Sequence, residues 1–405
     1  MAKASKDKDA NGLFDLLDEM NPFASYMDDD SNKINDWIDT GSLIMNAIIS
    51  GSMYKGIPVG RCTLLAGESG VGKSYMAMKI IGNAQKKGMK VLLFDTENAT
   101  DDLMVMNLGA DPSKIKNYPP RSIEDMKNAI YAILKKIYEM EEIHRKDPTK
   151  PSMFGKVLIV IDSLANVVSE LELKRMDKES TSADMGTKAK AIRALLTMAT
   201  SFGKLTGTTF LVTNHIYDNP TEMYPDLVKN MSGGKASRYL PHVVLQLAKR
   251  NLKEKDSGEE DTAALGKGVS GIEMRGMCVK NRIIRPLLEG SLYLSWAHGL
   301  DHEYGLLDLA IQLGVIERHG ATYSLTSTGE SLGYAKTFKK DKELWKEKIY
   351  PEIERLLAEK WSYQNSSESI EVEPPGNDDE QEDGIKPTDM TLEISAEDAD
   401  KTIEI

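Results

Sequence analysis

The chain of 405 residues is 40% hydrophobic, which is enough for a large core, and no run of about 18 apolar residues predicts a transmembrane helix. The formal net charge of -12 arises wholly from residues 366–405, which hold 14 acidic residues and two lysines, so charge does not exclude DNA as a partner of the neutral body. Residues 1–20 do not resemble a secretory signal, and we expect no membrane partner. Cys62 and Cys278 lie in apolar runs, which predicts buried free thiols.

Along the chain, residues 1–33 form a polar arm that we expect to serve oligomerisation, and residues 34–300 form the main domain. Near-continuous apolar runs predict strands that are buried on both faces of a parallel sheet, at 61–67, 90–97, 156–163 and 208–215. Helical periods lie between them, at about 73–87, 122–140 and 184–203. This alternation predicts an α/β fold with a mostly parallel central sheet.

The pattern changes after residue 240. Three strands without intervening helices, at 242–250, 271–282 and 285–296, predict an antiparallel extension of the sheet, and the insert 254–268 predicts an exposed loop. Residues 301–361 are interpreted as a small, helical C-terminal domain. Residues 362–405 are acidic and contain Pro and Gly, which predicts a disordered tail.

A phosphate-binding motif lies between the first predicted strand and the first long helix. Gly67, Gly72, Lys73 and Ser74 fit the pattern G-x4-G-K-[ST]. The glycines let backbone N–H groups surround phosphates, Lys73 reaches the β- and γ-phosphates of ATP, and the Ser74 hydroxyl binds Mg²⁺. The predicted nucleotide-binding residues are Gly67, Glu68, Ser69, Gly70, Val71, Gly72, Lys73, Ser74 and Tyr75.

Two acidic residues end neighbouring predicted strands. Asp162 can hold the Mg²⁺ shell, although an Asp at this position would also fit a helix N-cap. Glu97 can polarise the water that attacks the γ-phosphate, although a plain charge at a strand end would look the same. These residues indicate an ATPase of one of several families.

Segments around the motif narrow the choice. IDTGSLIMNAIISGSMYKGIPVGR precedes it, and DTENATDD, VIDSLANV, TNH, KNRIIRP and YGLLDLAIQLGVIERHGATYSL follow it in order. Together they resemble the RecA family of strand-exchange proteins over residues 34–361. Within that family, the Asn214–His215 pair and GLLDLAIQLG are most similar to the branch of phage UvsX recombinases.

The resemblance implies a RecA-like P-loop ATPase core and further site residues. Glu97 matches the family's catalytic glutamate, and Asp101 matches the acid near the adenine, whereas Met104 replaces a tyrosine that packs on the base. His215 falls on the residue that senses the γ-phosphate, although alone it would suit a structural hydrogen bond. A further basic pair, Lys280 and Arg282, matches residues that reach the neighbouring subunit's ATP; the alternative is a solvated sheet face.

Two polar segments follow central strands, where open α/β sheets bind ligands: residues 168–186 and 216–238. Long loops of this kind are functional or are disordered surface insertions. Glycines, bases and aromatics suit a loop that binds single-stranded DNA. The predicted DNA-binding residues are Lys229, Gly233, Gly234, Lys235 and Arg238.

The resemblance implies a DNA-dependent ATPase that forms a homo-oligomeric helical filament on single-stranded DNA and catalyses homologous pairing and strand exchange with double-stranded DNA, in recombination-dependent replication and repair. It also implies a mediator protein and a single-strand-binding protein as partners, and a cytoplasmic location, in the host if phage-encoded. The alternatives are a hexameric replicative helicase, which usually carries an N-terminal collar, and a phosphotransferase that does not act on DNA. The acidic tail is hypothesised to compete with DNA for the basic loops and to dock partner proteins.

Overall fold

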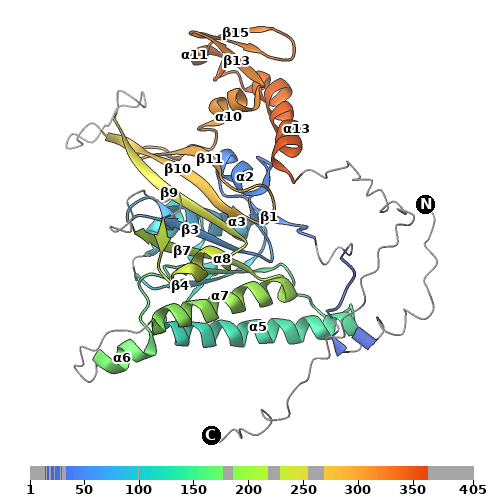
Figure 1. Cartoon of the computed structure of the whole chain (residues 1–405), viewed down its shortest axis with the longest axis vertical. Coiled ribbons are helices and arrows are strands. Elements are labelled where there is room, and N and C mark those ends of the chain that lie inside the picture. The colour runs from blue at the N-terminus through green and yellow to red at the C-terminus, as the bar shows by residue number, and fades with distance from the viewer. Residues whose placement is uncertain are drawn as a thin grey trace, which may run out of the picture. The chain divides into compact units, whose positions relative to one another are not determined.

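The structure is a computed structural model that describes residues 14, 16–17, 20–21, 23–27, 29, 33–98, 100–176, 186–217, 229–253 and 269–363. Its centre is a ten-stranded sheet (Figure 1), in the order β12-β11-β10-β9-β3-β7-β6-β4-β5, with β8 paired to β7. Six strands form the parallel part: β3 (Cys62–Gly67), β4 (Lys90–Asp95), β5 (Ile115–Asn117), β6 (Val157–Asp162), β7 (Thr209–Tyr217) and β9 (Val243–Lys253). The predicted α/β fold with a mostly parallel sheet is confirmed.

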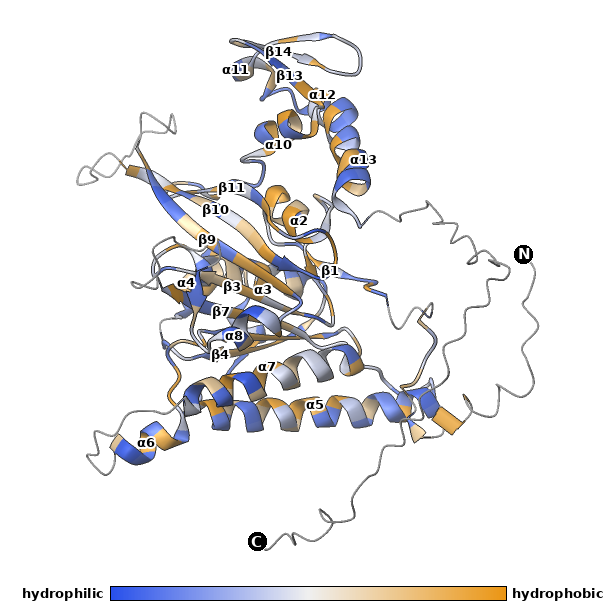
Figure 2. Ribbon diagram, viewed as in Figure 1, coloured by the Kyte–Doolittle hydropathy of each residue, from blue (hydrophilic) through white to orange (hydrophobic). Residues whose placement is uncertain are grey.

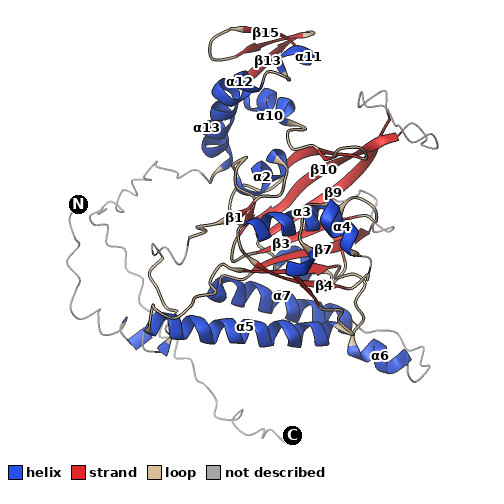
Figure 3. Ribbon diagram, turned by 180° about the vertical axis from the view of Figure 1, so that it is seen from behind, coloured by secondary structure: helices blue, strands red, loops and turns tan. Residues whose placement is uncertain are grey.

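Helices cover both faces of the parallel strands. Helices α2 (Leu43–Ser50) and α3 (Lys73–Lys86) belong to one hydrophobic cluster, and α5 (Ile123–Lys146) and α7 (Thr187–Thr206) belong to the other. The last two lie side by side (Figure 3). All eight residues of α2 are buried, and the helix is largely coloured as hydrophobic (Figure 2).

Strand β3 shows why the apolar runs predicted the sheet. Leu65 packs into the cluster with α2 and α3, whereas Leu64 and Ala66 pack into the cluster with α5 and α7. Side chains alternate between the faces of a strand, so a strand covered on both faces needs an apolar residue at every position. Cys62 and Cys278 are buried free thiols, as predicted, and burial raises the pKa of each to about 12.

Strand β9 joins the parallel part to an antiparallel part. It pairs in parallel with β3 and antiparallel with β10 (Val269–Asn281), which is followed by β11 (Leu288–Ser295) and β12 (Gly299–Leu300). The predicted antiparallel extension is therefore confirmed. The expected loop 254–268 and the tail lie outside the described residues.

Several short elements line the sheet edges and connections. They are β1 (Trp37–Ile38), β2 (Ile57–Pro58), α4 (Asp102–Asn107), a 3-10 turn (Pro112–Lys114), α6 (Glu170–Met176), β8 (Asn230–Met231) and α8 (Lys235–Tyr239). The last three, α6, β8 and α8, lie in or at the end of the segments that we predicted as long loops, so those segments contain regular elements. Residues 177–185 and 218–228 of these segments lie outside the described residues.

The C-terminal residues are not purely helical, and the prediction of a helical module is wrong in this respect. A three-stranded antiparallel sheet lies between helices because Gly320, at φ +64°, turns the chain between two alternating runs. The elements are α10 (Leu306–Leu313), β13 (Ile316–His319), β14 (Thr322–Leu325), β15 (Ser331–Tyr334), α11 (Ala335–Phe338), α12 (Lys342–Leu344), a π-helical turn (Trp345–Ile349) and α13 (Tyr350–Trp361). Among the described residues, no helix is both long and apolar enough to span a membrane.

Candidate active site

The phosphate-binding motif forms the turn between β3 and α3, as predicted. Gly70 and Gly72 have left-handed φ values of +69° and +96°. A Cβ atom on Gly67 would lie 2.7 Å from Val71 Cγ1 and 2.9 Å from the Leu247 carbonyl oxygen, so only glycine fits there. Helix α3 begins at Lys73 without a side-chain cap, and its first N–H groups remain available to an anion.

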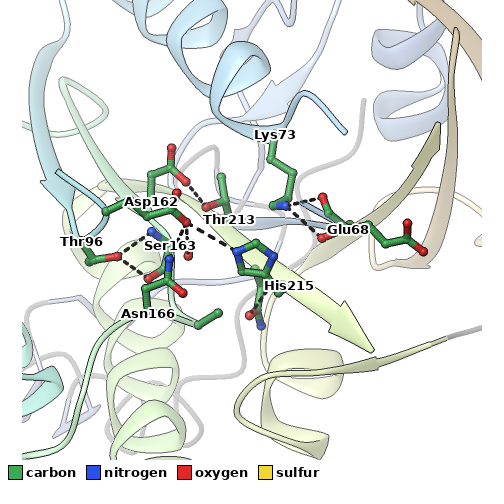
Figure 4. A network of polar contacts seen from close by, with 12 residues as sticks. Glu68, Lys73, Thr96, Asp162, Ser163, Asn166, Thr213 and His215 are labelled. Atoms are coloured by element: carbon green, nitrogen blue, oxygen red, sulfur yellow. Dashed lines mark hydrogen bonds and ion pairs between the residues drawn. The ribbon is translucent and has the colours of Figure 1, made fainter. Parts of the chain in front are cut away.

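Lys73 lies inside this turn (Figure 4). Its ammonium donates hydrogen bonds to the carbonyl oxygens of Gly67 at 2.9 Å and Glu68 at 2.8 Å. Burial lowers the pKa of Lys73, whereas Asp162 and Glu97 raise it. A buried cation that is held only by carbonyls can exchange them for phosphate oxygens when a nucleotide binds.

Lys249 is a second cation at the turn, and the sequence did not reveal it. Its Nζ lies 3.2 Å from the carbonyl oxygens of both Ser69 and Gly70. Lys249 comes from β9, where it is opposite Met274 of β10, and the Met274 sulfur lies 2.8 Å from the point where a Gly72 Cβ would stand. Strands β9 and β10 therefore contact the phosphate turn through Lys249 and Met274.

The predicted metal ligands lie together. Asp162 ends β6 and is buried, and its carboxylate accepts hydrogen bonds from the hydroxyls of Thr213 and Ser74. Burial raises the pKa of Asp162, and these hydrogen bonds lower it. One carboxylate and one hydroxyl suit Mg²⁺, which takes its other ligands from water and phosphate. In the described part of the chain, no group of three or more His, Cys, Asp or Glu could hold a metal.

Glu97 stands across the site from Lys73, and three side chains meet one of its oxygens. Its Oε1 accepts hydrogen bonds from Asn166 Nδ2 at 2.7 Å and Ser163 Oγ at 3.1 Å, and His215 Nε2 lies 3.5 Å away. Within the described residues, Oε2 accepts no hydrogen bond. The Thr96 hydroxyl and the Ser163 backbone exchange two hydrogen bonds, at 2.8 and 2.9 Å, which fixes this edge of the sheet (Figure 4).

His215 connects the site to the segment 216–238. The backbone of His215 accepts from Ser232 N at 3.4 Å, and the Asn214 amide donates to the Ser232 carbonyl at 2.9 Å. Strand β8 then pairs with the end of β7, through Ile216 and Met231. A displacement of His215 would therefore shift Ser232 and β8, where this segment returns to the core.

Lys280 and Arg282 lie elsewhere. Strand β10 ends at Asn281, so Arg282 is outside the strand, contrary to our prediction, yet both cations converge on one backbone oxygen. Lys280 Nζ donates to the carbonyls of Tyr239 and, at 2.6 Å, Pro241; an Arg282 guanidinium nitrogen lies 3.4 Å from the Tyr239 carbonyl. Among the described residues neither has a carboxylate partner. Burial and Arg282 lower the pKa of Lys280 to about 8.

Comparison with known proteins agrees with this geometry. The family described as the KaiC ATPase matches residues 38–241, half of the chain. Protein RecA of Mycoplasma genitalium is 26% identical over 361 residues, which is 89% of this chain and 96% of the relative. Protein RecA of Thermotoga sp. is 28% identical over 335 residues, 80% of this chain and 82% of the relative.

The chain belongs to the family of RecA-like ATPases.

In this RecA-like ATPase, one of the predicted DNA-binding residues, Lys229, lies next to the phosphate turn. Lys229 Nζ is 3.7 Å from Glu68 Oε1 of the turn. Gly233 has φ +86°, and a Cβ there would lie 2.6 Å from Ile192, so glycine is required. Gly234 precedes α8, and Lys235 and Arg238 lie on that helix.

Asp101 and Tyr75, predicted to bind the nucleotide of the RecA-like ATPase, make hydrogen bonds within the chain. Asp101 caps α4 by accepting a hydrogen bond from Met104 N at 2.6 Å, and the Met104 side chain packs against the core. The Tyr75 hydroxyl accepts a hydrogen bond from Leu300 N at 3.1 Å. A cavity of about 560 Å³ lies beside Tyr75 and is also lined by Trp296, whose side chain is exposed.

Proposed function

We propose that this RecA-like ATPase is a recombinase that forms a helical filament on single-stranded DNA and catalyses homologous pairing and strand exchange, most similar to the phage UvsX branch. The observation that carries the proposal is the position of His215. It touches Glu97 of the nucleotide site, and it stands on the strand that leads into the segment expected to bind DNA. The similarity to several proteins named RecA supports it.

ATP and Mg²⁺ fit the residues at the carboxyl edge of the sheet. The backbone of the phosphate turn and Lys73 would hold the phosphates, and Ser74 with Asp162 would hold the ion. Bound Mg²⁺ neutralises charge that develops on the phosphates. Glu97 would orient the attacking water with Oε2, because its other oxygen already accepts two hydrogen bonds.

The basic pair would act on the nucleotide of a neighbouring subunit. Lys280 and Asn281 are opposite Val244 and Val243 at the start of β9, whereas the phosphate turn follows Gly67, which is opposite Leu247. Three to four strand residues separate these positions, or roughly 10–13 Å at the usual rise per residue. Because Lys280 points to carbonyls before β9, the pair is directed away from the nucleotide site of its own chain.

Double-stranded DNA is the second substrate, and a mediator and a single-strand-binding protein are the expected partners. The DNA contacts are assigned to Lys229, Lys235 and Arg238, with Gly233 and Gly234, both at positive φ, between them. A base beside the phosphate turn, as Lys229 is, suits a DNA affinity that depends on ATP.

Electron microscopy with single-stranded DNA and a non-hydrolysable ATP analogue tests this function. A recombinase gives continuous helical filaments, whereas a hexameric helicase gives closed rings. The same protein should then exchange strands between a circular single strand and a homologous linear duplex, and not with a heterologous duplex. Rings, or filaments that do not exchange strands, would contradict the proposal.

A further inference from the structure

Asn166 is an exposed residue that the motifs did not identify, yet it makes the shortest hydrogen bond to Glu97. The distance from its Nδ2 to Glu97 Oε1 is 2.7 Å, against 3.1 Å for Ser163 Oγ and 3.5 Å for His215 Nε2. Hydrogen bonds to an ionised group are stronger than those between neutral groups. Figure 4 shows Asn166 pointing from the end of β6 toward this cluster.

The backbone around Asn166 is held on both sides, although its side chain is exposed. Leu164 N donates to the Thr213 carbonyl at 3.0 Å, and the Val168 carbonyl accepts from Ile123 N at 3.0 Å. Val167, the next residue, is buried in the cluster with α5 and α7. A side chain on such an anchored turn has a defined position, which a group that orients a catalytic residue requires.

The hydrogen bond leaves one carboxylate oxygen of Glu97 for chemistry. A carboxylate can rotate and exchange its two oxygens, and water can approach the wrong one. With Asn166 and Ser163 both on Oε1, rotation would break two hydrogen bonds, so Oε2 stays directed into the site. The Asn166 amide can donate here, whereas an acid at the same position would repel Glu97.

We propose that Asn166 is a positioning residue that fixes the orientation of Glu97 for attack on the γ-phosphate. It acts through Glu97 and does not touch the nucleotide. The inference rests on the proposed function, in which Glu97 orients the water.

Two substitutions separate positioning from a structural role. Asn166→Asp keeps the size and the turn preference of the residue but replaces the donor with a negative charge. Asn166→Ala removes the side chain altogether. If Asn166 only supports the turn, Asn166→Asp should lower hydrolysis less than Asn166→Ala does. If Asn166 acts as a donor to Glu97, Asn166→Asp should lower hydrolysis more than Asn166→Ala does.

We expect the kcat of DNA-stimulated hydrolysis to fall by about tenfold in Asn166→Ala and by about a hundredfold in Asn166→Asp, as for loss of a hydrogen bond to a charged group. Affinity for a non-hydrolysable ATP analogue and the thermal unfolding temperature should stay unchanged. Filaments of both variants should last longer in ATP, which electron microscopy or DNA release can follow without measuring hydrolysis.

Glu97→Gln, alone and combined with Asn166→Ala, completes the experiment. If Asn166 acts through Glu97, the double variant should hydrolyse ATP no more slowly than Glu97→Gln. The positioning role is overturned if Asn166→Asp lowers hydrolysis less than Asn166→Ala does. It is also overturned if both Asn166 variants hydrolyse ATP at the wild-type rate while Glu97→Gln is inactive. In either case the role of Glu97 stands. Full activity of Glu97→Gln would instead remove the role of Glu97 from the proposed function.

Discussion

The two ends of the parallel strands treat their charged groups differently. At the carboxyl ends of β4, β6 and β7, the charged and polar side chains pair with one another: Asp162 with Thr213 and Ser74, and Glu97 with Asn166. Where β9 begins, Lys280 and Arg282 meet backbone carbonyls and, in the described part of the chain, no carboxylate. The charged groups at the carboxyl ends of the strands are paired within the chain, whereas the cations where β9 begins have no carboxylate partner among the described residues.

On our proposal, this difference marks the part of the site that another molecule supplies. His242 adds to the basic end, because burial together with the cations of Arg61, Arg282 and Lys280 lowers its pKa to about 4. The three cations that face this buried ring give the region a positive potential, which favours a bound anion. On our proposal that anion is the phosphate of a nucleotide bound by the neighbouring subunit.

The largest effect is expected from removing both cations. The double variant Lys280→Ala, Arg282→Ala should bind ATP normally but lose DNA-stimulated hydrolysis by about 10³–10⁵-fold, as when an arginine finger acting in trans is lost. Arg285→Ala, which removes an exposed cation nearby, is the matched control and should hydrolyse ATP normally.

Mixing tests whether the site is shared. Lys73→Ala has intact cations but lacks the phosphate-binding lysine, so alternating it with the double variant in one filament should restore part of the activity. If DNA-bound mixed filaments hydrolyse ATP only at the summed rate of the two separate proteins, the shared site is contradicted. The cations would then act only on the nucleotide of their own chain.

The next effect concerns the paired groups at the carboxyl ends of the strands. Glu97→Gln should retain ATP binding and lower hydrolysis by about 10²–10⁴-fold, the range for loss of a general base. Its filaments should persist in ATP. Glu139→Gln on α5, where the acid is exposed and 3.7 Å from Lys136, is the control. Wild-type hydrolysis by Glu97→Gln on DNA would show that the pairing around Glu97 is structural.

The pKa of Lys280 gives a smaller, pH-dependent effect. Burial lowers this pKa to about 8, so the free subunit loses the charge as the pH rises through 8. The phosphate of a neighbouring subunit's ATP would favour the charged ammonium form of Lys280. Assembly with ATP should therefore take up a proton above pH 8, and the assembly constant should fall by up to about tenfold per pH unit. Sedimentation at pH 7, 8 and 9 measures this. Lys280→Arg, which stays protonated, should remove most of the dependence, and a wild type that assembles equally at all three pH values would contradict the assignment.

The smallest effect is expected from the tail, which carries all of the net charge. A chain ending at residue 363 should bind duplex DNA about threefold more tightly at low salt, because less negative charge competes with the phosphates, and the gain should fade as salt is added. Hydrolysis at saturating DNA should not change, since neither the nucleotide site nor the basic pair is altered. Equal duplex binding with and without the tail across a salt series would remove this hypothesis.

Local sequence predicted the parts of the site that local structure builds. The phosphate turn needs Gly67, Gly70 and Gly72 in one short segment, so its motif was sufficient. Asp162 was found because it ends a strand of the parallel sheet, whereas the roles of Glu97 and His215 also depended on the resemblance to the RecA family. Glu97 was predicted to end a strand, but β4 ends at Asp95, and Glu97 lies two residues beyond it.

Contacts between distant segments were not predictable. Asn166 meets Glu97 across 69 residues of chain, and Lys249 reaches Ser69 across 180. No sequence motif indicated a catalytic or binding role for either residue. The C-terminal hairpins were missed because the apolar residues around Gly320 also suit a helix, whereas only the packed structure selects the pairing of β13 with β14.

The two ends of the parallel strands give any row of these subunits a direction, if they join as proposed. One terminus of the row exposes a phosphate turn without cations, and the other exposes cations without a nucleotide. An open row therefore always has one complete site fewer than it has subunits, and turnover per subunit rises with its length. The terminal subunit that lacks a donor of cations keeps its ATP longest, so the two termini would gain and lose subunits at different rates.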